Sequence, residues 1–270
     1  MTIAAVITAA GSSSRFNAGY GDSGCALKKE YLSLPCLNDS PPGAGPESLT
    51  VLGAAVSAFA LCGRVSQIVI TVPQNGENGE IAARAALPQR FFEAGCNAKI
   101  HFVPGGMTRR QSVHNALNFL SMLEGCTECA GEMLQYVLIH DGARPWVSTT
   151  LINKIIDAAI LHKAAIPVLS LLETPKELED GAIEDGDLRF VKQHLRRDNI
   201  ASAQTPQAFE FRAILQAHEK AAAQELAFGR EWTDDAEIWG AFVGKCAAIA
   251  GEHCNKKITF KEDLLVPKSE

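Results

Sequence analysis

A turn rich in glycine and serine follows the first apolar run of the sequence. The run Ile3 to Thr8 leads into Ala9-Ala10-Gly11-Ser12-Ser13-Ser14-Arg15. Such a turn exposes backbone N–H groups, and its small side chains let a phosphate approach them. The turn lacks the Gly-Lys-Ser/Thr ending of a P-loop and the Gly-x-Gly-x-x-Gly of a dinucleotide site. Arg15, Lys28 and Lys29 follow in the sequence, so they could supply the positive charge that a triphosphate requires.

A second glycine turn has the same composition. The apolar run Ala98 to Val103 ends in Pro104-Gly105-Gly106-Met107-Thr108-Arg109-Arg110-Gln111-Ser112. A helix that starts here would offer its free N–H groups and its dipole to an anion. The Ser112 hydroxyl could form a hydrogen bond with a base or a ribose.

A carboxylate directly follows a third apolar run. Met133 to His140 leads into Asp141-Gly142-Ala143-Arg144-Pro145. At this edge of an α/β sheet a carboxylate can hold a Mg²⁺ ion that bridges nucleotide phosphates. Alternatively, Asp141 only caps the following turn, and Arg144 only pairs with a neighbouring carboxylate.

Two late segments are weaker candidates. Arg196-Arg197 precedes Gln204-Thr205-Pro206-Gln207, and Cys254-Asn255-Lys256-Lys257-Ile258-Thr259 begins a candidate strand. By position alone such basic pairs are usually solvated. The histidines have no spacing typical of metal ligands, Gly-x-Ser-x-Gly is missing, and Cys126-Thr127-Glu128-Cys129 has no second pair. A catalytic zinc site, a serine hydrolase and a zinc ribbon are therefore not expected.

The pattern of apolar residues predicts an α/β fold. Five short runs rich in Val and Ile are expected as strands, namely 3–8, 67–73, 98–103, 133–140 and 164–169. Residues 49–61, 110–123 and 149–162 have helical length and spacing, with Ser148, Thr149 or Thr150 as candidate N-cap of the last. Strands that alternate with helices imply parallel pairing, and ligands then lie at the carboxyl ends of the strands.

Length and irregular segments bound the domain organisation. We expect residues 1–270 to form a single domain, with loops at 35–46 and 74–79 where polar residues, glycine and proline are frequent. The strongly charged stretch 171–203 is expected to project as an arm, although a solvated meander is an alternative.

Composition excludes several classes of protein. Hydrophobic residues make up 47% of the chain and charged residues 21%, as in ordinary globular proteins. A net charge of −6 provides no global attraction to nucleic acid or anionic lipid, so an anionic ligand needs a local basic cluster. No apolar stretch is long enough for a membrane span, and the first ten residues lack the basic start of a secretory signal. The eight scattered cysteines are expected to be reduced thiols in the cytoplasm.

Seven segments together resemble one enzyme family. They are Ala9 to Arg15, Lys29-Glu30-Tyr31-Leu32, Gly105 to Val113, His140 to Pro145, Thr205-Pro206-Gln207, Thr233-Asp234-Asp235 and Asn255 to Thr259. In this order they resemble the cytidylyltransferases that act on 2-C-methyl-D-erythritol 4-phosphate in non-mevalonate isoprenoid synthesis. The resemblance implies a Rossmann-like nucleotidyltransferase fold with a mostly parallel sheet, helices on both faces and an arm that reaches across a homodimer.

The resemblance also implies roles for individual residues. Arg15 and Lys29 are expected to hold the triphosphate of CTP and the transition state. The turns Ala9-Ala10-Gly11-Ser12 and Gly105-Gly106 are expected to bind the nucleotide, together with Arg109 and Ser112. Asp141 matches a carboxylate near Mg²⁺ and near the ribose or phosphates.

Further matches concern the second substrate. Thr174 and Arg197 match arm positions that hold the phosphate of the polyol phosphate, and Lys257 matches a late lysine beside the reacting phosphate. Ser13 stands where the family usually has a second glycine, and Cys254 stands where it has a carboxylate. The insertion at 35–46 is also atypical.

Other functions stay open at this point. A cytidylyltransferase for another polyol phosphate, such as ribitol 5-phosphate, would share the nucleotide half of the site. The departures at Ser13 and Cys254 are compatible with a nucleotide-binding module without turnover. A nicotinamide dehydrogenase is not favoured, because the turn after the first apolar run lacks the dinucleotide fingerprint.

Overall fold

The expected apolar runs form strands of one central sheet. The computed structural model describes residues 1–17, 28–35, 49–74, 77–93, 97–124, 133–179 and 189–264. The five predicted strands are present as β1 (Thr2–Thr8), β2 (Gln67–Val72), β3 (Lys99–Pro104), β4 (Leu134–Asp141) and β5 (Ala164–Ser170). Strand β1 lies between β2 and β4 and pairs with both in parallel, so the expected parallel core of the sheet is confirmed.

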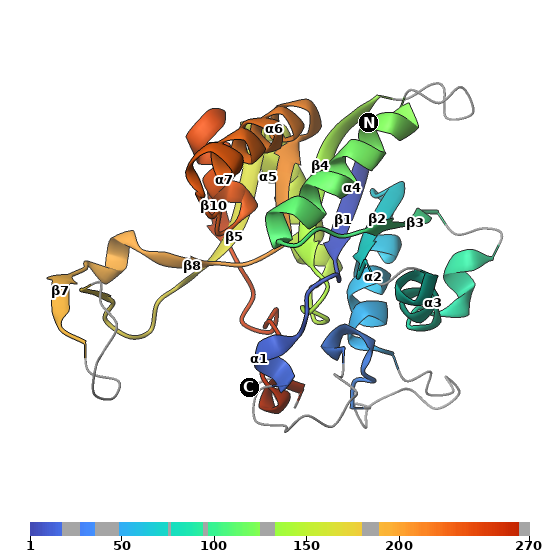
Figure 1. Ribbon diagram of the computed structural model, residues 1–270, viewed down its shortest axis with the longest axis horizontal. Helices are drawn as coiled ribbons and strands as arrows, with labels where there is room; N and C mark the ends of the chain where they lie inside the picture. The colour runs from blue at the N-terminus through green and yellow to red at the C-terminus, as the bar shows by residue number, and fades with distance from the viewer. Residues whose placement is uncertain are drawn as a thin grey trace.

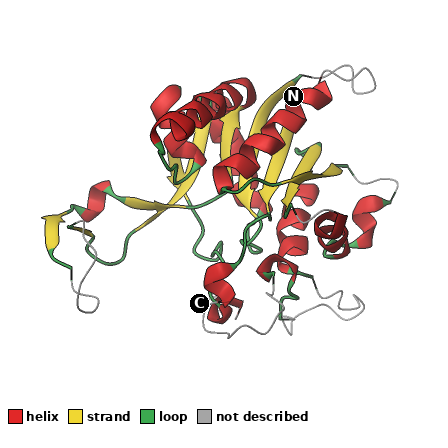
Figure 2. Ribbon diagram, in the orientation of Figure 1, coloured by secondary structure: helices red, strands yellow, loops and turns green. Residues whose placement is uncertain are grey.

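Additional strands complete the sheet beside β4. The order is β10-β5-β9-β4-β1-β2-β3, with β10 at Ala247–Ala250 and β9 at Gln207–Glu210, and β8 (Ala201–Ala203) pairs with β5. Strands β8 and β9 run antiparallel to their neighbours, whereas β10 is parallel to β5. The sheet is therefore mostly parallel, with antiparallel pairing where the chain returns from the segment between β5 and β9 (Figures 1 and 2).

Helices cover both faces of the sheet, because side chains of the strands alternate between two cores. The helices are α1 (Ser14–Asn17), α2 (Val51–Leu61), α3 (Glu77–Ala85), α4 (Arg109–Glu124), α5 (Thr149–His162), α6 (Phe211–Phe228) and α7 (Asp235–Phe242). Ile3 and Ile7 of β1 belong to the core under α2 and α5, and Val6 belongs to the core under α4, α6 and α7. Short 3₁₀ turns occur at Lys29–Tyr31, Gln89–Phe92, Arg197–Asn199 and Lys261–Leu264.

Two local predictions are wrong. The loop expected at 74–79 gives way to α3, which already begins at Glu77. The segment 254–259 is not a strand: its backbone joins a loop, with the N–H of Ile258 donating to the carbonyl of Ala143 at 2.8 Å. Among the described residues no strand pairs with this segment, and β10 has already ended at Ala250. Cys126, Cys129 and residues 36–46 lie outside the described residues.

The segment that follows β5 extends away from the sheet. β6 (Lys176–Leu178) and β7 (Val191–His194) form an antiparallel two-stranded sheet of their own. In Figure 1 this pair lies at the far left, separate from the central sheet and its helices. No helix in the described ranges is long and apolar enough to span a membrane.

Candidate active site

A cleft of about 790 Å³ opens at the carboxyl ends of the strands. Its lining combines the two glycine turns with residues from both ends of the chain; it includes Thr8, Ala10, Gly11, Ser12, Arg15, Lys28, Lys29, Gly106, Arg109, Ser112, Asp141 and Lys257. This is the sheet edge that the alternation of strands and helices predicts for a ligand. Ala9 is buried directly below the first turn, where its N–H donates to the carbonyl of Thr71 at 3.1 Å.

Three cationic side chains from distant parts of the chain line this cleft together. They are Arg15, Lys29 and Lys257. Lys29 is largely buried, and its ammonium donates to the backbone carbonyl of Ile258 at 2.7 Å. Burial lowers the pKa of Lys29, and the positive charges of Lys257 and Arg15 lower it further, against the opposing effect of Glu30 and Asp141. The cations are therefore close enough to repel one another, and an anion would relieve this repulsion.

Asp141 is a carboxylate of the cleft that three cationic side chains contact. Its Oδ2 lies 2.8 Å from Nζ of Lys257 and 3.5 Å from Nε of Arg144, and its Oδ1 lies 3.3 Å from Nε of Arg109. Burial favours the neutral carboxyl, but Arg109, Lys257 and Arg144 hold the pKa of Asp141 far below its usual range. The alternative that Arg144 pairs with Asp141 is thus observed, and Asp141 is ionised.

A chain of hydrogen bonds fixes the backbone of Asp141. Its N–H donates to the hydroxyl of Thr205 at 3.1 Å, and that hydroxyl lies 3.0 Å from Nδ1 of His140. Nε2 of His140 lies 3.1 Å from the carbonyl of Arg144, so Nε2 carries the proton and Nδ1 accepts from Thr205. Asn255 also binds this chain, since its side-chain amide donates to the carbonyl of Thr205 at 2.8 Å. The position of Thr205 in the sequence did not indicate a role in the site. The only sequence signal for it was the match of Thr205-Pro206-Gln207 to the family.

The two glycine turns touch each other. A Cβ atom at Gly105 would lie 2.3 Å from Cβ of Ala10 and 2.9 Å from Oγ of Ser112, so only glycine fits. The Ser112 hydroxyl accepts from the N–H of Gly106 at 2.9 Å and donates to the carbonyl of Thr108 at 3.0 Å. Ser112 therefore shapes the second turn from within, besides lining the cleft.

Ser13 adopts the left-handed conformation that usually favours glycine. Its φ is 55°, and its hydroxyl donates to Oε2 of Glu30 at 3.3 Å and accepts from the N–H of Lys29 at 3.4 Å. Lys28 donates to the carbonyl of Gly11 and lies 3.6 Å from Glu30. The turn thus reaches this backbone conformation with serine, and the buried Glu30, to which no role was assigned from the sequence, contacts both Ser13 and Lys28.

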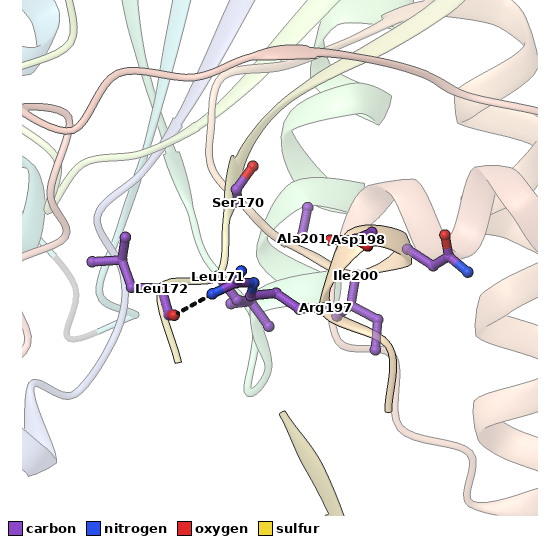
Figure 3. Close-up of a pocket in the computed structure, with 8 residues that line it drawn as sticks. Ser170, Leu171, Leu172, Arg197, Asp198, Ile200 and Ala201 are labelled. Carbon is purple, nitrogen blue, oxygen red and sulfur yellow. Dashed lines mark hydrogen bonds between the residues drawn. The ribbon is translucent and has the colours of Figure 1, made fainter. Parts of the chain in front are cut away.

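The arm residues are not part of this cleft in a single chain. Thr174 is exposed, and Arg197 donates to the carbonyl of Leu172 at 3.0 Å. Arg197 lines a second hollow of about 550 Å³ together with Ser170, Leu172 and Asp198 (Figure 3). Cys254 is exposed and is not among the residues that line the larger cleft.

The carboxylates of the cleft suit a metal ion that arrives with phosphates better than a resident one. Among the described residues no group of three or more His, Cys, Asp and Glu side chains is placed to hold a metal. Asp141 and Glu30 are the carboxylates that line the cleft, and both already have cationic partners. Mg²⁺ commonly takes one or two carboxylates plus substrate phosphates and water. One carboxylate, that of Asp141, would therefore be sufficient as protein ligand of such an ion.

Comparison with known proteins identifies the family. The family model for 2-C-methyl-D-erythritol 4-phosphate cytidylyltransferase matches residues 3–269. The chain belongs to this family. A cytidylyltransferase of this name from Geobacillus thermodenitrificans is 31% identical over 265 residues, which are 98% of this chain and 95% of the relative. The corresponding protein from Pelotomaculum thermopropionicum is 33% identical over 99% of this chain and 93% of its own length.

Solved structures show the same fold. The crystal structure of 4-diphosphocytidyl-2C-methyl-D-erythritol synthase from Anaerococcus prevotii has a TM-score of 0.67 at 25% identity, and covers 98% of this chain and 93% of that one. The cytidylyltransferase structure from Thermus thermophilus has a TM-score of 0.64 at 25% identity, with coverages of 98% and 96%. The predicted α/β nucleotidyltransferase fold is confirmed.

Proposed function

We propose that the protein transfers the cytidylyl group of CTP to 2-C-methyl-D-erythritol 4-phosphate and releases pyrophosphate, as a step of non-mevalonate isoprenoid synthesis. The observation that carries the proposal is the convergence of Arg15, Lys29 and Lys257 in one cleft of a chain that matches the family over residues 3–269. Both substrates are polyanions, which repel each other until cations bring them together.

The proposed reaction requires charge stabilisation more than proton transfer. A phosphate oxygen of the alcohol phosphate attacks the α-phosphorus of CTP, the bond to the β-phosphate oxygen breaks, and pyrophosphate leaves with that electron pair. A phosphomonoester is largely a dianion near neutral pH, with a second pKa of about 6, so no general base is needed. Arg15 and Lys29 stabilise the negative charge that spreads over the oxygens of the α-phosphate.

Lys257 and Asp141 have complementary parts in this proposal. Lys257 contacts Asp141 in the structure, and its side chain is 35% exposed, so a phosphate in the cleft can compete for it. We propose that Asp141 would hold a Mg²⁺ ion bound to the CTP phosphates, and this ion would screen the phosphate charge. The residues that would contact the nucleotide line the same cleft; they are Ala10, Gly11, Ser12, Gly106, Arg109 and Ser112.

We further propose that the active form is a homodimer in the cytoplasm. Thr174 and Arg197 belong to the segment between β5 and β8, and neither lines the cleft of its own chain. We propose that they contact the phosphate of the second substrate in the cleft of a partner subunit. The described cysteines Cys62, Cys246 and Cys254 are free thiols, as expected for the cytoplasm.

An assay of pyrophosphate release tests the proposal. The protein is given CTP, Mg²⁺ and either 2-C-methyl-D-erythritol 4-phosphate or ribitol 5-phosphate. Fast release with the first alcohol only supports the proposal, and fast release with ribitol 5-phosphate only would replace the substrate. CTP binding in a calorimeter without release from either mixture would indicate a nucleotide-binding module. Replacing CTP by UTP tests the base, and omitting Mg²⁺ should stop the reaction.

A further inference from the structure

Asp235 is a fully buried carboxylate to which the proposed reaction assigns no part. It is the first residue of α7, but the preceding residue caps this helix: Oδ1 of Asp234 accepts from the N–H of Glu237 at 2.8 Å. The side chain of Asp235 is therefore free of the capping task. It has no exposed surface and is not part of the cleft lining.

The Asp235 carboxylate instead contacts Arg109. Its Oδ2 accepts a hydrogen bond from Nη1 of Arg109 at 2.8 Å, and its Oδ1 lies 3.2 Å from Nε2 of the equally buried His218. Burial opposes the ionisation of Asp235, but the charge of Arg109 and the contact with His218 hold its pKa below the ordinary value. Since Nε of Arg109 lies 3.3 Å from Asp141, one guanidinium spans a buried carboxylate and a carboxylate of the cleft.

This bridge affects which cation Asp141 can release. The side chains of its three partners are exposed to different extents: 35% for Lys257, 28% for Arg109 and 12% for Arg144. Lys257 is the most accessible to a phosphate, but Arg109 is nearly as accessible and also lines the cleft. An unanchored Arg109 could turn to the phosphate in place of Lys257. Arg109 and Lys257 would then compete for the same phosphate.

We infer that Asp235 is a positioning residue that holds Arg109 on Asp141 and away from the phosphate of the attacking substrate, so that Lys257 is the cation that turns to this phosphate. The inference rests on the proposed function and extends it to a residue that touches neither substrate. Asp235 acts through Arg109, and the adjacent Asp234 serves only the helix and the Gln207 side chain, which donates to its Oδ2 at 2.8 Å.

The variant Asp235→Asn tests the inference, because it keeps the size of the side chain and removes its charge. We expect kcat/KM for the alcohol phosphate to fall by about 10-fold or more, since misplacement of a reacting group by about 1 Å can cost up to about 100-fold. The Kd of CTP, measured by calorimetry without the alcohol, should rise by a smaller factor than kcat/KM falls, because Arg15 and Lys29 still bind the triphosphate.

Glu124→Gln is the matched control. Glu124 is a largely buried carboxylate at the other end of α4 and pairs with Arg212, so the change removes a similar ion pair far from the cleft. Both kinetic values should be those of the wild type. An Asp235→Asn variant with a lowered melting temperature and an unchanged kcat/KM would show a merely structural role. A raised Kd of CTP with an unchanged kcat would show that Arg109 serves the nucleotide alone. Either result overturns the inference.

A second variant keeps the inference testable if Asp235→Asn does not fold. Arg109→Lys retains the positive charge but cannot span two carboxylates. It should lower kcat/KM for the alcohol phosphate as Asp235→Asn does, and where both variants fold, the double variant should lose no more than the worse single one. Unchanged kinetics of Arg109→Lys, or multiplied losses, would contradict it. A wild-type protein that releases no pyrophosphate would instead disprove the proposed function.

Discussion

At the scale of single residues, buried side chains determine how the cleft is charged. Lys29 is held by the carbonyl of Ile258, and Asp141 is held by Thr205 through its backbone and by three cations through its side chain. Each of these groups is largely removed from water. Its partners therefore decide whether the group stays charged and where it points.

Lys29→Ala removes a cation that the proposed mechanism directs at the α-phosphate. We expect turnover to fall by roughly 100-fold or more, as with the loss of other single electrostatic donors. The rate of pyrophosphate release per folded protein is the measurement, because the variant also leaves the Ile258 carbonyl without its partner. Lys256→Ala, at an exposed position next to Lys257, is the control and should keep its rate. An unchanged rate in Lys29→Ala would remove Lys29 from the mechanism.

His140 makes the stability of the protein dependent on pH. It is fully buried, and burial lowers its pKa from 6.5 to about 4. Between these values the unfolded chain binds a proton that the folded chain excludes, so the free energy of unfolding decreases as the pH falls from 6.5 to 4. The full effect of this one histidine is about 3 kcal/mol.

Urea unfolding at pH 7, 5.5 and 4.5 measures this dependence. His140→Gln should unfold more easily at pH 7, but its stability should change less with pH than that of the wild type. His162→Gln, at an exposed position at the end of α5, serves as control and should keep the wild-type slope. Equal slopes in all three proteins would exclude His140 as the source.

At the scale of elements, the ends of strands β1 and β3 are joined through their glycine turns. Gly105 accepts no side chain, because Ala10 of the other turn occupies the space. Strands β1 and β3 are separated by β2 in the sheet. The contact between their turns therefore fixes the distance between two segments that both line the cleft.

Gly105→Ala should therefore push the two turns apart. We expect the KM for CTP to rise by about 10-fold, because the nucleotide contacts both turns in the proposed complex. Gly240→Ala is the matched control: Gly240 is exposed near the end of α7, and a Cβ atom there would meet nothing within 4 Å. That change should raise the free energy of unfolding by about 0.5–1 kcal/mol and leave KM unchanged. Equal KM values for both variants would contradict a contact of CTP with the second turn.

At the scale of the whole molecule, the arm carries Arg197 and its neighbours away from the central sheet of their own chain. β6, β7 and the turn at Arg197–Asn199 lie beyond the edge of the central sheet in Figure 1, and several apolar side chains, including Leu172 and Phe190, are exposed there. Exposed apolar surface on a projecting segment favours contact with a second copy of the chain.

Mixing two inactive variants tests whether the arm serves a partner subunit. Lys29→Ala damages the cleft, and Arg197→Ala damages the arm, so a mixed dimer would contain one site with both groups intact. After subunits have been mixed in equal amounts, about a quarter of the wild-type activity should return. The control is a mixture of Lys29→Ala with Lys257→Ala. Every cleft in that mixture lacks one of the two lysines, so the mixture should stay inactive. No recovery in the first mixture, with exchange shown by mass spectrometry, would place Arg197 in its own chain's site.

The local pattern of residues determined much of this protein. Five strands, three helices and the turns that contain Gly11, Gly105 and Asp141 could be predicted, because side-chain periodicity and glycine act over a few residues. Membership of the family followed from short segments kept in order along the chain.

Only the tertiary structure decided how these segments meet. The antiparallel β9, the contact of Lys29 with Ile258, and the bridge of Arg109 between Asp141 and Asp235 join residues that are 32 to 229 positions apart, or pair strands out of chain order. No local periodicity encodes such pairs. They form because charges and backbone groups that folding buries must have partners inside the protein.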